Sequence, residues 1–376
     1  MKIICQKQEL AKALNIVSKA VTTRSTMPVL KGILLKAYPD GRLTLSSSDL
    51  EISIQDTIAV TVEKKEDAGS IVVMARKFNE IVRSLPGEEL TIQTIERNDE
   101  TIVEIQSVTA DFEIIGISAD EFPVLQEVNE NTASIPVDNR TIREMIEKTK
   151  FAASVDESRG IITGILLEID GSRISTVAID GYRMAINRRT MPGDEKHKFV
   201  ISAKIMDELS KILSDQEEEE NGTLYLSNRK AVFVFGNVQA ELKLLEGDFI
   251  DYRSILPKNS GISVIVKRKE LMESIQRASL FANAGKNNLV KFQLKENILT
   301  VSSKSEEGKA TEDLVVEKTG ENLEIGFNAR YLLDIIRAVD DEEVKLLFNS
   351  AIDPCLIVPL QGDAYEHLLL PVRLNS

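Results

Sequence analysis

The stretch MARKFNEIVRSLP, residues 74–86, has the spacing of an amphipathic helix. In such a helix its apolar residues share one face: Phe78, Ile81, Val82 and Leu85. Arg76 and Arg83 are seven residues apart and fall together on the opposite face. For a single helix, such a basic pair is ordinary solvated surface. The stretch therefore predicts one helix with a buried apolar face and a basic back.

The same pattern occurs twice more, as SAKIMDELSKIL at residues 202–213 and NARYLLDIIRAV at residues 328–339. Both copies keep the basic pair seven residues apart, as Lys204 with Lys211 and as Arg330 with Arg337. The first alanines of the three helices, at positions 75, 203 and 329, are spaced by 128 and 126 residues. Three copies in one register make a chance arrangement a weak explanation.

Other elements repeat with the same period. A further amphipathic helix opens each unit, at residues 7–20, 139–152 and 267–281. The first two carry basic pairs, Lys12 with Lys19 and Arg143 with Lys150, and the third lacks one. The tetrapeptide Gly-Ile-Leu-Leu occurs at residues 32–35 and again at 164–167, and alternating strands follow at 43–46, 174–177 and 299–302.

We count two helices and roughly eight antiparallel strands in each unit. A period near 130 residues is too long for a solenoid and indicates three tandem copies of one α+β domain. Polar segments after residues 120–123 and around 256–261 mark the junctions. The sequence thus predicts domains at residues 1–129, 130–257 and 258–376.

Composition is that of a globular protein, with 43% hydrophobic and 28% charged residues in 376. No apolar run approaches the ~20 residues that span a bilayer, and the start turns polar too soon for a signal peptide. Two cysteines, Cys5 and Cys355, make no disulfide framework and fit a reducing cytoplasm. The net charge of −14 argues against a nucleic-acid partner only if it is evenly spread, and acid gathers at residues 215–220 and 340–343.

No catalytic motif stands out. The two histidines, His197 and His367, have no partner at metal-ligand spacing, and we expect no cofactor or metal. Walker loops, dinucleotide-binding glycines and nucleophile elbows are absent from the sequence. Carboxylates are too numerous to exclude a hidden acid pair, so an enzyme stays open as one alternative. A second is an acidic structural repeat protein that never meets DNA.

Two apolar segments could line a pocket for a partner peptide. Residues 177–185 replace the polar hairpin of the first unit with Ala-Ile-Asp-Gly-Tyr-Arg-Met, and residues 367–374 are apolar at a chain end, where polar residues are usual. On these residues alone, a hairpin and a last core strand are the favoured interpretation, and a pocket is the alternative.

The whole chain resembles the bacterial DNA polymerase III β subunits, the sliding clamps. The resemblance rests on the three tandem domains, RSTMPVL at residues 24–30, VAIDGYRM at 177–184, DYR at 251–253 before LPKN, and the ending PVRL at 371–374. It implies that two helices in each domain are backed by two antiparallel sheets, and that two subunits join head to tail in a ring. The implied function is a processivity factor that encircles duplex DNA and is not an enzyme.

The resemblance implies that the basic helix faces line the hole and meet DNA phosphates. Arg24 matches a DNA-contacting position, and residues 156–161 form a loop that also touches DNA in this family. The expected DNA-binding residues are thus basic and lie on or beside the helices: Lys12, Lys19, Arg24, Arg76, Arg83, Arg143, Lys150, Lys204, Lys211, Arg330 and Arg337.

The resemblance also implies a pocket into which the replicative polymerase, the clamp loader and repair proteins insert short peptides. Its residues come from three segments: Arg159, Ile162, Ile179, Gly181, Tyr182, Arg183 and Met184; Ile250, Ser254 and Ile255; and Leu368, Leu369, Leu370, Pro371, Val372, Arg373 and Leu374. Arg and Tyr side chains are expected on its rim. Ile250 and Ser254 replace a Pro and an Arg of some members.

The implied homodimer contact joins domain one, around Phe112 and Ile114, to domain three, around Leu280, Phe281 and residues 311–316. Exposed sheet edges would pair across the two subunits.

Overall fold

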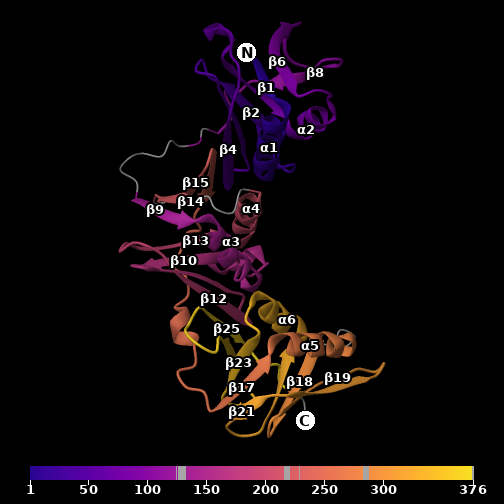
Figure 1. Ribbon diagram of the computed structural model, residues 1–376, viewed down its shortest axis with the longest axis vertical. Helices are drawn as coiled ribbons and strands as arrows, with labels where there is room; N and C mark the ends of the chain where they lie inside the picture. The colour runs from indigo at the N-terminus through magenta and orange to yellow at the C-terminus, as the bar shows by residue number, and fades with distance from the viewer. Residues whose placement is uncertain (124, 126–132, 216–220, 228, 283–287, 375–376) are drawn as a thin grey trace. The chain divides into compact units, whose positions relative to one another are not determined.

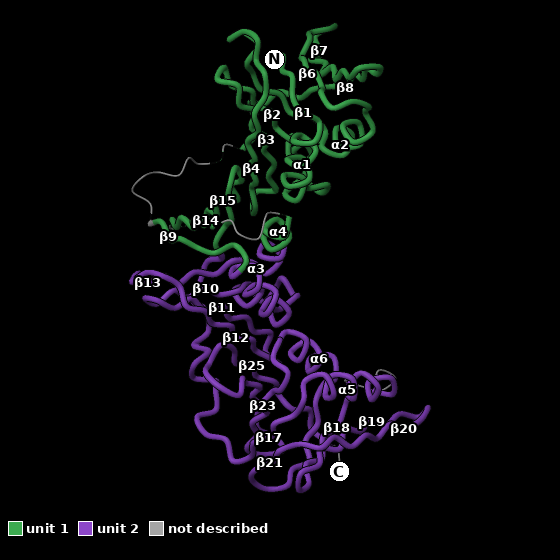
Figure 2. Tube along the Cα trace, viewed as in Figure 1, with its two compact units in different colours: residues 1–140, 208–244 green, residues 141–207, 245–376 purple. Residues whose placement is uncertain are grey.

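A computed structural model describes residues 1–123, 125, 133–215, 221–227, 229–282 and 288–374. The predicted junction at 129/130 and the acidic run 216–220 lie outside these residues. The described chain forms two compact units, residues 1–140 with 208–244 and residues 141–207 with 245–376 (Figure 2).

The first unit contains one twelve-stranded antiparallel sheet, in the order β1-β6-β7-β8-β5-β2-β3-β4-β16-β15-β14-β9. Its strands are β1 Lys2–Gln6, β2 Gly32–Ala37, β3 Arg42–Ser48, β4 Ile52–Ala59, β5 Gly69–Met74, β6 Glu89–Arg97, β7 Glu100–Gln106, β8 Asp111–Ile117, β9 Ala133–Asp138, β14 Asn221–Leu226, β15 Lys230–Phe235 and β16 Val238–Lys243. Helices α1, Lys7–Val17, and α2, Ala75–Ser84, pack against each other and against this sheet (Figure 1).

The second unit contains a nine-stranded sheet, β13-β10-β11-β12-β25-β24-β23-β17-β21, and a four-stranded sheet, β20-β19-β18-β22. Their strands are β10 Gly164–Asp170, β11 Arg173–Ile179, β12 Arg183–Thr190, β13 Lys196–Ser202, β17 Ile262–Lys267, β18 Leu289–Lys295, β19 Ile298–Lys304, β20 Lys309–Val315, β21 Glu317–Thr319, β22 Leu323–Asn328, β23 Glu343–Phe348, β24 Cys355–Val358 and β25 Tyr365–Leu369. Helix α5, Arg268–Ala282, packs on β18–β20 and on α6, Ala329–Ala338.

Two helices cross the division between the units: α3, Asn139–Glu147, and α4, Ala203–Ser214. The six predicted helices are therefore all present, although those at 7–20 and 139–152 end early and continue as short 3₁₀ turns at Ser18–Ala20 and Lys150–Ala152. The cause is the same in both. The hydroxyl of Ser18 bonds the Leu14 carbonyl, and the hydroxyl of Thr149 bonds the Met145 carbonyl at 2.7 Å. A side chain that takes the i−4 carbonyl competes with the helix ladder.

The repeated Gly-Ile-Leu-Leu marks a close approach of two strands. A Cβ atom at Gly32 would lie 2.8 Å from the Val73 carbonyl oxygen on β5, and one at Gly164 would lie 2.9 Å from the Ile201 carbonyl oxygen on β13. Only glycine fits at these positions without displacing backbone. The apolar residues that follow each glycine are buried in the cores, except Leu34, which is partly buried.

Consecutive repeats are joined by sheet pairing. In the first unit β4 pairs with β16, with Asp56 opposite Val238. In the second unit β12 pairs with β25, with Asn187 opposite Tyr365. Because Asp56 pairs with Leu45 on β3 as Asn187 pairs with Thr176 on β11, the two joints use the same position of the repeat. Each joint therefore links the fourth strand of one repeat to the last strand of the next.

Candidate DNA-facing helices and partner-binding surface

The helix at residues 75–84 has its apolar and basic residues on separate faces. Phe78, Ile81 and Val82 are buried, whereas the Arg76 side chain is 93% exposed and 3.1 Å from Glu80. Arg83 is exposed and donates a 3.4 Å hydrogen bond to Asn15. Such exposed guanidinium groups can reach a phosphate with little desolvation cost.

The other predicted DNA-binding residues divide into three groups. Most are exposed on or beside helices: Lys12, Arg24, Lys204, Lys211, Arg330 and Arg337. Arg143 is half-buried. Lys19 and Lys150 are engaged within the protein. Lys19 is only 17% exposed and forms an ion pair with Asp215.

Lys150 forms ion pairs with Glu147, at 2.6 Å, and with Asp207. Burial alone would lower the pKa of Lys150, but these two carboxylates outweigh it and the pKa is raised. The ammonium group therefore stays charged while it donates two hydrogen bonds to carboxylates of the protein itself. Glu147 is only three residues from Lys150 in the sequence, but the spacing of the basic residues could not reveal Asp207 or Asp215, which lie in α4 and just after it.

The predicted pocket residues lie around the joint of β12 with β25. Four of them belong to one buried apolar cluster: Ile162, Ile179, Met184 and Leu368. At the surface of this cluster, Tyr182 is 58% exposed, and Ile250, Ile255 and Leu370 are also exposed. The backbone N–H of Leu370 donates to the Tyr182 carbonyl at 2.9 Å. The surface thus offers apolar anchors with an aromatic residue among them.

The last predicted residues lie against another strand. The Val372 N–H donates to the Gly326 carbonyl on β22 at 2.8 Å, and a Cβ atom at Gly326 would lie 2.8 Å from Leu374 Cδ2. The chain end is therefore fixed to β22 at a glycine that permits the approach. None of the residues lining the cavity of about 770 Å³ near Lys148 and Arg188 belongs to the predicted pocket.

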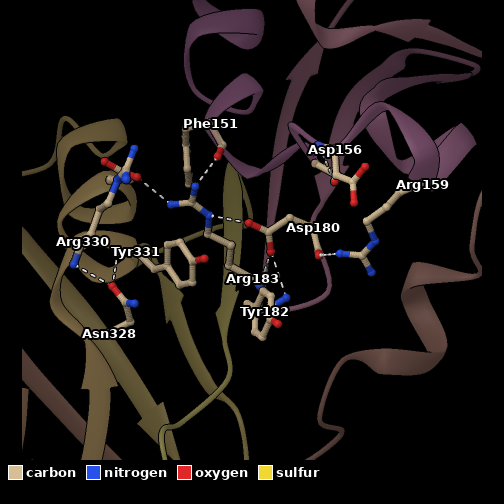
Figure 3. Close-up of polar contacts among 11 residues, drawn as sticks. Phe151, Asp156, Arg159, Asp180, Tyr182, Arg183, Asn328, Arg330 and Tyr331 are labelled. Carbon is tan, nitrogen blue, oxygen red and sulfur yellow. Dashed lines mark hydrogen bonds and ion pairs between the residues drawn. The ribbon is translucent and has the colours of Figure 1, made fainter. Parts of the chain in front are cut away.

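Arg183 differs from the rim residue expected from the sequence. Its side chain is only 9% exposed, and its guanidinium is enclosed by protein groups (Figure 3). Arg159 is exposed, as a rim residue should be, and it donates to the Asp180 carbonyl. Residues 156–160 of the loop at 156–161 are also exposed, and Ile161 is partly buried. The Asp156 carboxylate accepts hydrogen bonds from the Ser158 N–H at 3.0 Å and hydroxyl at 2.7 Å.

One anchor of this surface was not anticipated. The Tyr252 hydroxyl donates to Glu168 at 2.7 Å, and Arg253 forms a two-pronged pair with the same carboxylate on β10. Burial raises the pKa of Tyr252 beyond its usual range, and the Glu168 hydrogen bond adds to the effect. The motif DYR therefore fixes the segment that carries Ser254 and Ile255. Sequence shows the motif but not its partner, which is 84 residues away.

The reactive side chains are mostly shielded. Burial raises the pKa of Cys5 to about 12, with a contribution from Glu89, and also raises the pKa of Cys355. Burial lowers the pKa of His367 to about 3, and His197 lies 2.6 Å from Glu195. Within the described ranges no group of three acidic, Cys or His side chains is placed to hold a metal ion. None of the helices described is long and apolar enough to cross a bilayer.

Comparison with known proteins accounts for the full chain. Residues 1–126, 136–251 and 253–373 match the N-terminal, central and C-terminal domains of the DNA polymerase III beta subunit. A beta sliding clamp of Bacillus subtilis is 35% identical, over 99% of this chain and 100% of that protein. A crystal structure of the Bacillus subtilis DNA polymerase sliding clamp is 34% identical, with a TM-score of 0.94 and complete coverage of both chains. The beta subunit of Thermotoga maritima gives 29% identity and a TM-score of 0.89, again with complete coverage.

Three tandem α+β domains with exposed basic residues on their helices define a DNA clamp, a processivity factor of replication that is not an enzyme. Its partners as a class are DNA and a DNA polymerase. The chain belongs to the DNA polymerase III beta subunit family, the beta sliding clamps.

Proposed function

We propose that two copies of this chain close head to tail into a ring around duplex DNA in the cytoplasm. The basic helix faces meet the phosphates, and the polymerase, clamp loader and repair proteins bind by short peptides at the surface around Tyr182. The three domains of the ring are residues 1–129, 130–257 and 258–376. The observation that carries the proposal is the repeated sheet joint.

The two sheet joints within the chain predict a third joint of the same kind between two copies of the chain. The fourth strands β4 and β12 each pair with the last strand of the following repeat, β16 and β25. The third repeat has a fourth strand, β20, and the first repeat has a last strand, β8. Pairing β20 with β8 of a second copy completes the series. Two such contacts related by a two-fold axis close a ring without free ends.

Both strands have an available edge. Among the described residues, β20 is the outer strand of its sheet, and residues 111–115 of β8 pair with β7 alone. Apolar side chains beside these edges are unusually exposed, with Leu280 at 71% and Ile115 at 60%. An open edge next to exposed apolar residues is an aggregation hazard unless a partner covers it.

The repeat also sets the register. Ala240 and His367 lie opposite Ile54 and Ala185 in the two internal joints. By the strand pairings within each repeat, Phe112 corresponds to Ala240 and Ala310 corresponds to Ile54. Phe112 of one copy should therefore lie opposite Ala310 of the other.

A double variant, Phe112→Cys with Ala310→Cys, tests this register. Opposed residues on antiparallel strands have Cβ atoms about 4.5–5.5 Å apart, close enough for a disulfide after small adjustments. We expect mild oxidation to give a covalent dimer on a denaturing gel. Both native cysteines are buried and should not interfere. Glu113→Cys with Ala310→Cys is the matched control, because Glu113 faces the other side of β8; equal cross-linking of both pairs would reject the register.

Retention on DNA tests the ring. A closed ring stays on a circle because it encloses the DNA, its phosphate contacts let it slide without sequence preference, and it keeps a bound polymerase at high effective concentration. We expect labelled protein, loaded on a nicked circular duplex with its loader and ATP, to resist moderate salt and to leave once the circle is cut. Equal retention on circular and linear DNA would exclude topological binding.

A further inference from the structure

Arg183 is a buried cation, and each of its three guanidinium nitrogens donates a hydrogen bond to a protein acceptor. Its Nε donates to Asp180 Oδ2 at 3.0 Å, Nη1 to Asp334 Oδ2 at 2.7 Å, and Nη2 to the Phe151 carbonyl at 2.6 Å (Figure 3). Its guanidinium carbon lies 4.4 Å from the centroid of the Tyr331 ring and 5.2 Å from that of Phe151. Burying a charge is unfavourable unless it is fully bonded, and an apolar side chain could fill this space. The Arg183 contacts therefore fix the positions of the groups that they join, which an apolar side chain in the same space would not do.

The positions that these contacts fix belong to the Tyr182 loop. Asp180 accepts from Arg183 and also from the Tyr182 N–H at 2.8 Å, while Arg159 donates to the Asp180 carbonyl. The Tyr182 ring stacks on Tyr331 with centroids 5.9 Å apart. Tyr182, the exposed aromatic residue of the partner surface, is thus held by Arg183 through Asp180, and its ring is held by stacking on Tyr331.

The other end of this network is helix α6. Asn328 caps the helix by accepting from the Arg330 N–H at 3.0 Å and the Tyr331 N–H at 3.3 Å, which fixes Tyr331. Asp334 lies one turn further on and contacts two cations. Its Oδ2 accepts from buried Arg183, and its Oδ1 is 3.8 Å from Arg337, an exposed residue that is predicted to bind DNA. One carboxylate is therefore shared by the partner surface and the DNA-facing side of α6.

We propose that Arg183 is a positioning residue that couples peptide binding at the Tyr182 loop to DNA contact by α6, with Asp334 as the shared group. This inference rests on the proposed peptide and DNA surfaces. When a phosphate draws Arg337 away, Asp334 is left to Arg183 alone, and the Tyr182 loop is held more firmly. DNA then tightens peptide binding, and by thermodynamic reciprocity the peptide tightens DNA binding by the same factor.

The expected size of the coupling between peptide and DNA binding follows from the weaker of the two Asp334 contacts, the one with Arg337. Arg337 is half-exposed and 3.8 Å from Asp334, so its competition is that of a surface ion pair. We expect a coupling factor of about two to five. A larger factor would require a rearrangement that these contacts do not provide.

The experiment measures peptide affinity with and without a short linear duplex at low salt. The probe is a fluorescent peptide selected from a random display library against the whole protein, with Tyr182→Ala used to discard peptides bound elsewhere. Asp334→Asn and Arg183→Gln should both reduce the factor to one. Arg183→Gln should also weaken the peptide without DNA, because Asp180 loses its partner.

The control is Arg188→Gln, which removes a half-buried arginine of the same strand that pairs with Glu366 at 2.9 Å and does not contact Asp334. It should keep the wild-type coupling. Since Asp334 is more accessible than Arg183, its variant tests the idea even if Arg183→Gln fails to fold. A wild-type protein that binds peptide equally with and without duplex, or an Asp334→Asn variant that keeps the coupling, overturns the inference alone. Failure to select any Tyr182-dependent peptide overturns the partner surface, and the inference with it.

Discussion

The acid at the first sheet joint should set a pH dependence of stability. Asp56 is buried on β4 where it pairs with β16. Burial raises its pKa from 3.8 to about 6; the Thr57 N–H lowers it somewhat, and the charge of Glu9 raises it further. A carboxyl whose folded pKa is raised contributes stability that is fully present below 3.8 and is lost as the pH rises through 6. The difference corresponds to at most about 3 kcal/mol.

The variant Asp56→Asn replaces the carboxylate with a neutral group of the same shape. We expect it to match the wild type near pH 3.5 and to be more stable above pH 6, by up to about 3 kcal/mol. Urea unfolding midpoints between these pH values give the measurement, at one protein concentration because dimerisation shifts apparent stability. Glu66→Gln, an exposed change in the same unit, should show no such trend. A difference between Asp56→Asn and wild type that stays constant across the range would refute the reasoning.

Three further outcomes test the surfaces. Reversing Arg76, Lys204 and Arg330 together to Glu should weaken duplex binding and reduce the slope of log affinity against log salt by about 0.9 for each phosphate that the protein no longer neutralises, as titrations at several salt concentrations would show. Tyr182→Ala should weaken the selected peptide about tenfold or more in fluorescence titrations and leave the dimer intact. Leu280→Asp should shift the protein toward monomer in sedimentation equilibrium, since a charge would be buried at the β20 edge; unchanged association would place the interface elsewhere.

The sequence predicts the helices and strands well because burial has a period that local residues reveal. The three copies of the basic helix identified the repeat, and the glycine of Gly-Ile-Leu-Leu falls where β2 and β10 approach β5 and β13. For the helices predicted at residues 7–20 and 139–152, the predicted C-terminal end lies beyond the observed one. Nothing in their periodicity shows that the hydroxyls of Ser18 and Thr149 turn back to the preceding helical turn.

The sites were less accessible to sequence reasoning, because their partners are distant in the chain. Spacing groups Lys19 and Lys150 with the exposed cations, yet both form ion pairs with acids in or after α4. Arg183 stands beside Tyr182 in sequence and was expected on the same rim. Its burial depends on Asp334, 151 residues away, which no local pattern connects to it. The domain limits and the role of each site residue remain predictions.

The two joints within the chain and the joint proposed between two chains differ at one position of the repeat. Asp56 and Asn187 are buried in joints formed within the chain, where pairing is permanent. The corresponding residue of β20 is Glu312, which Arg277 holds through two 2.7 Å hydrogen bonds. Arg277 keeps the pKa of Glu312 below its usual range, so the edge stays charged at neutral pH. A charged edge resists indiscriminate pairing. In the proposed ring, Glu312 would thus protect the β20 edge from wrong pairing until a second copy covers it.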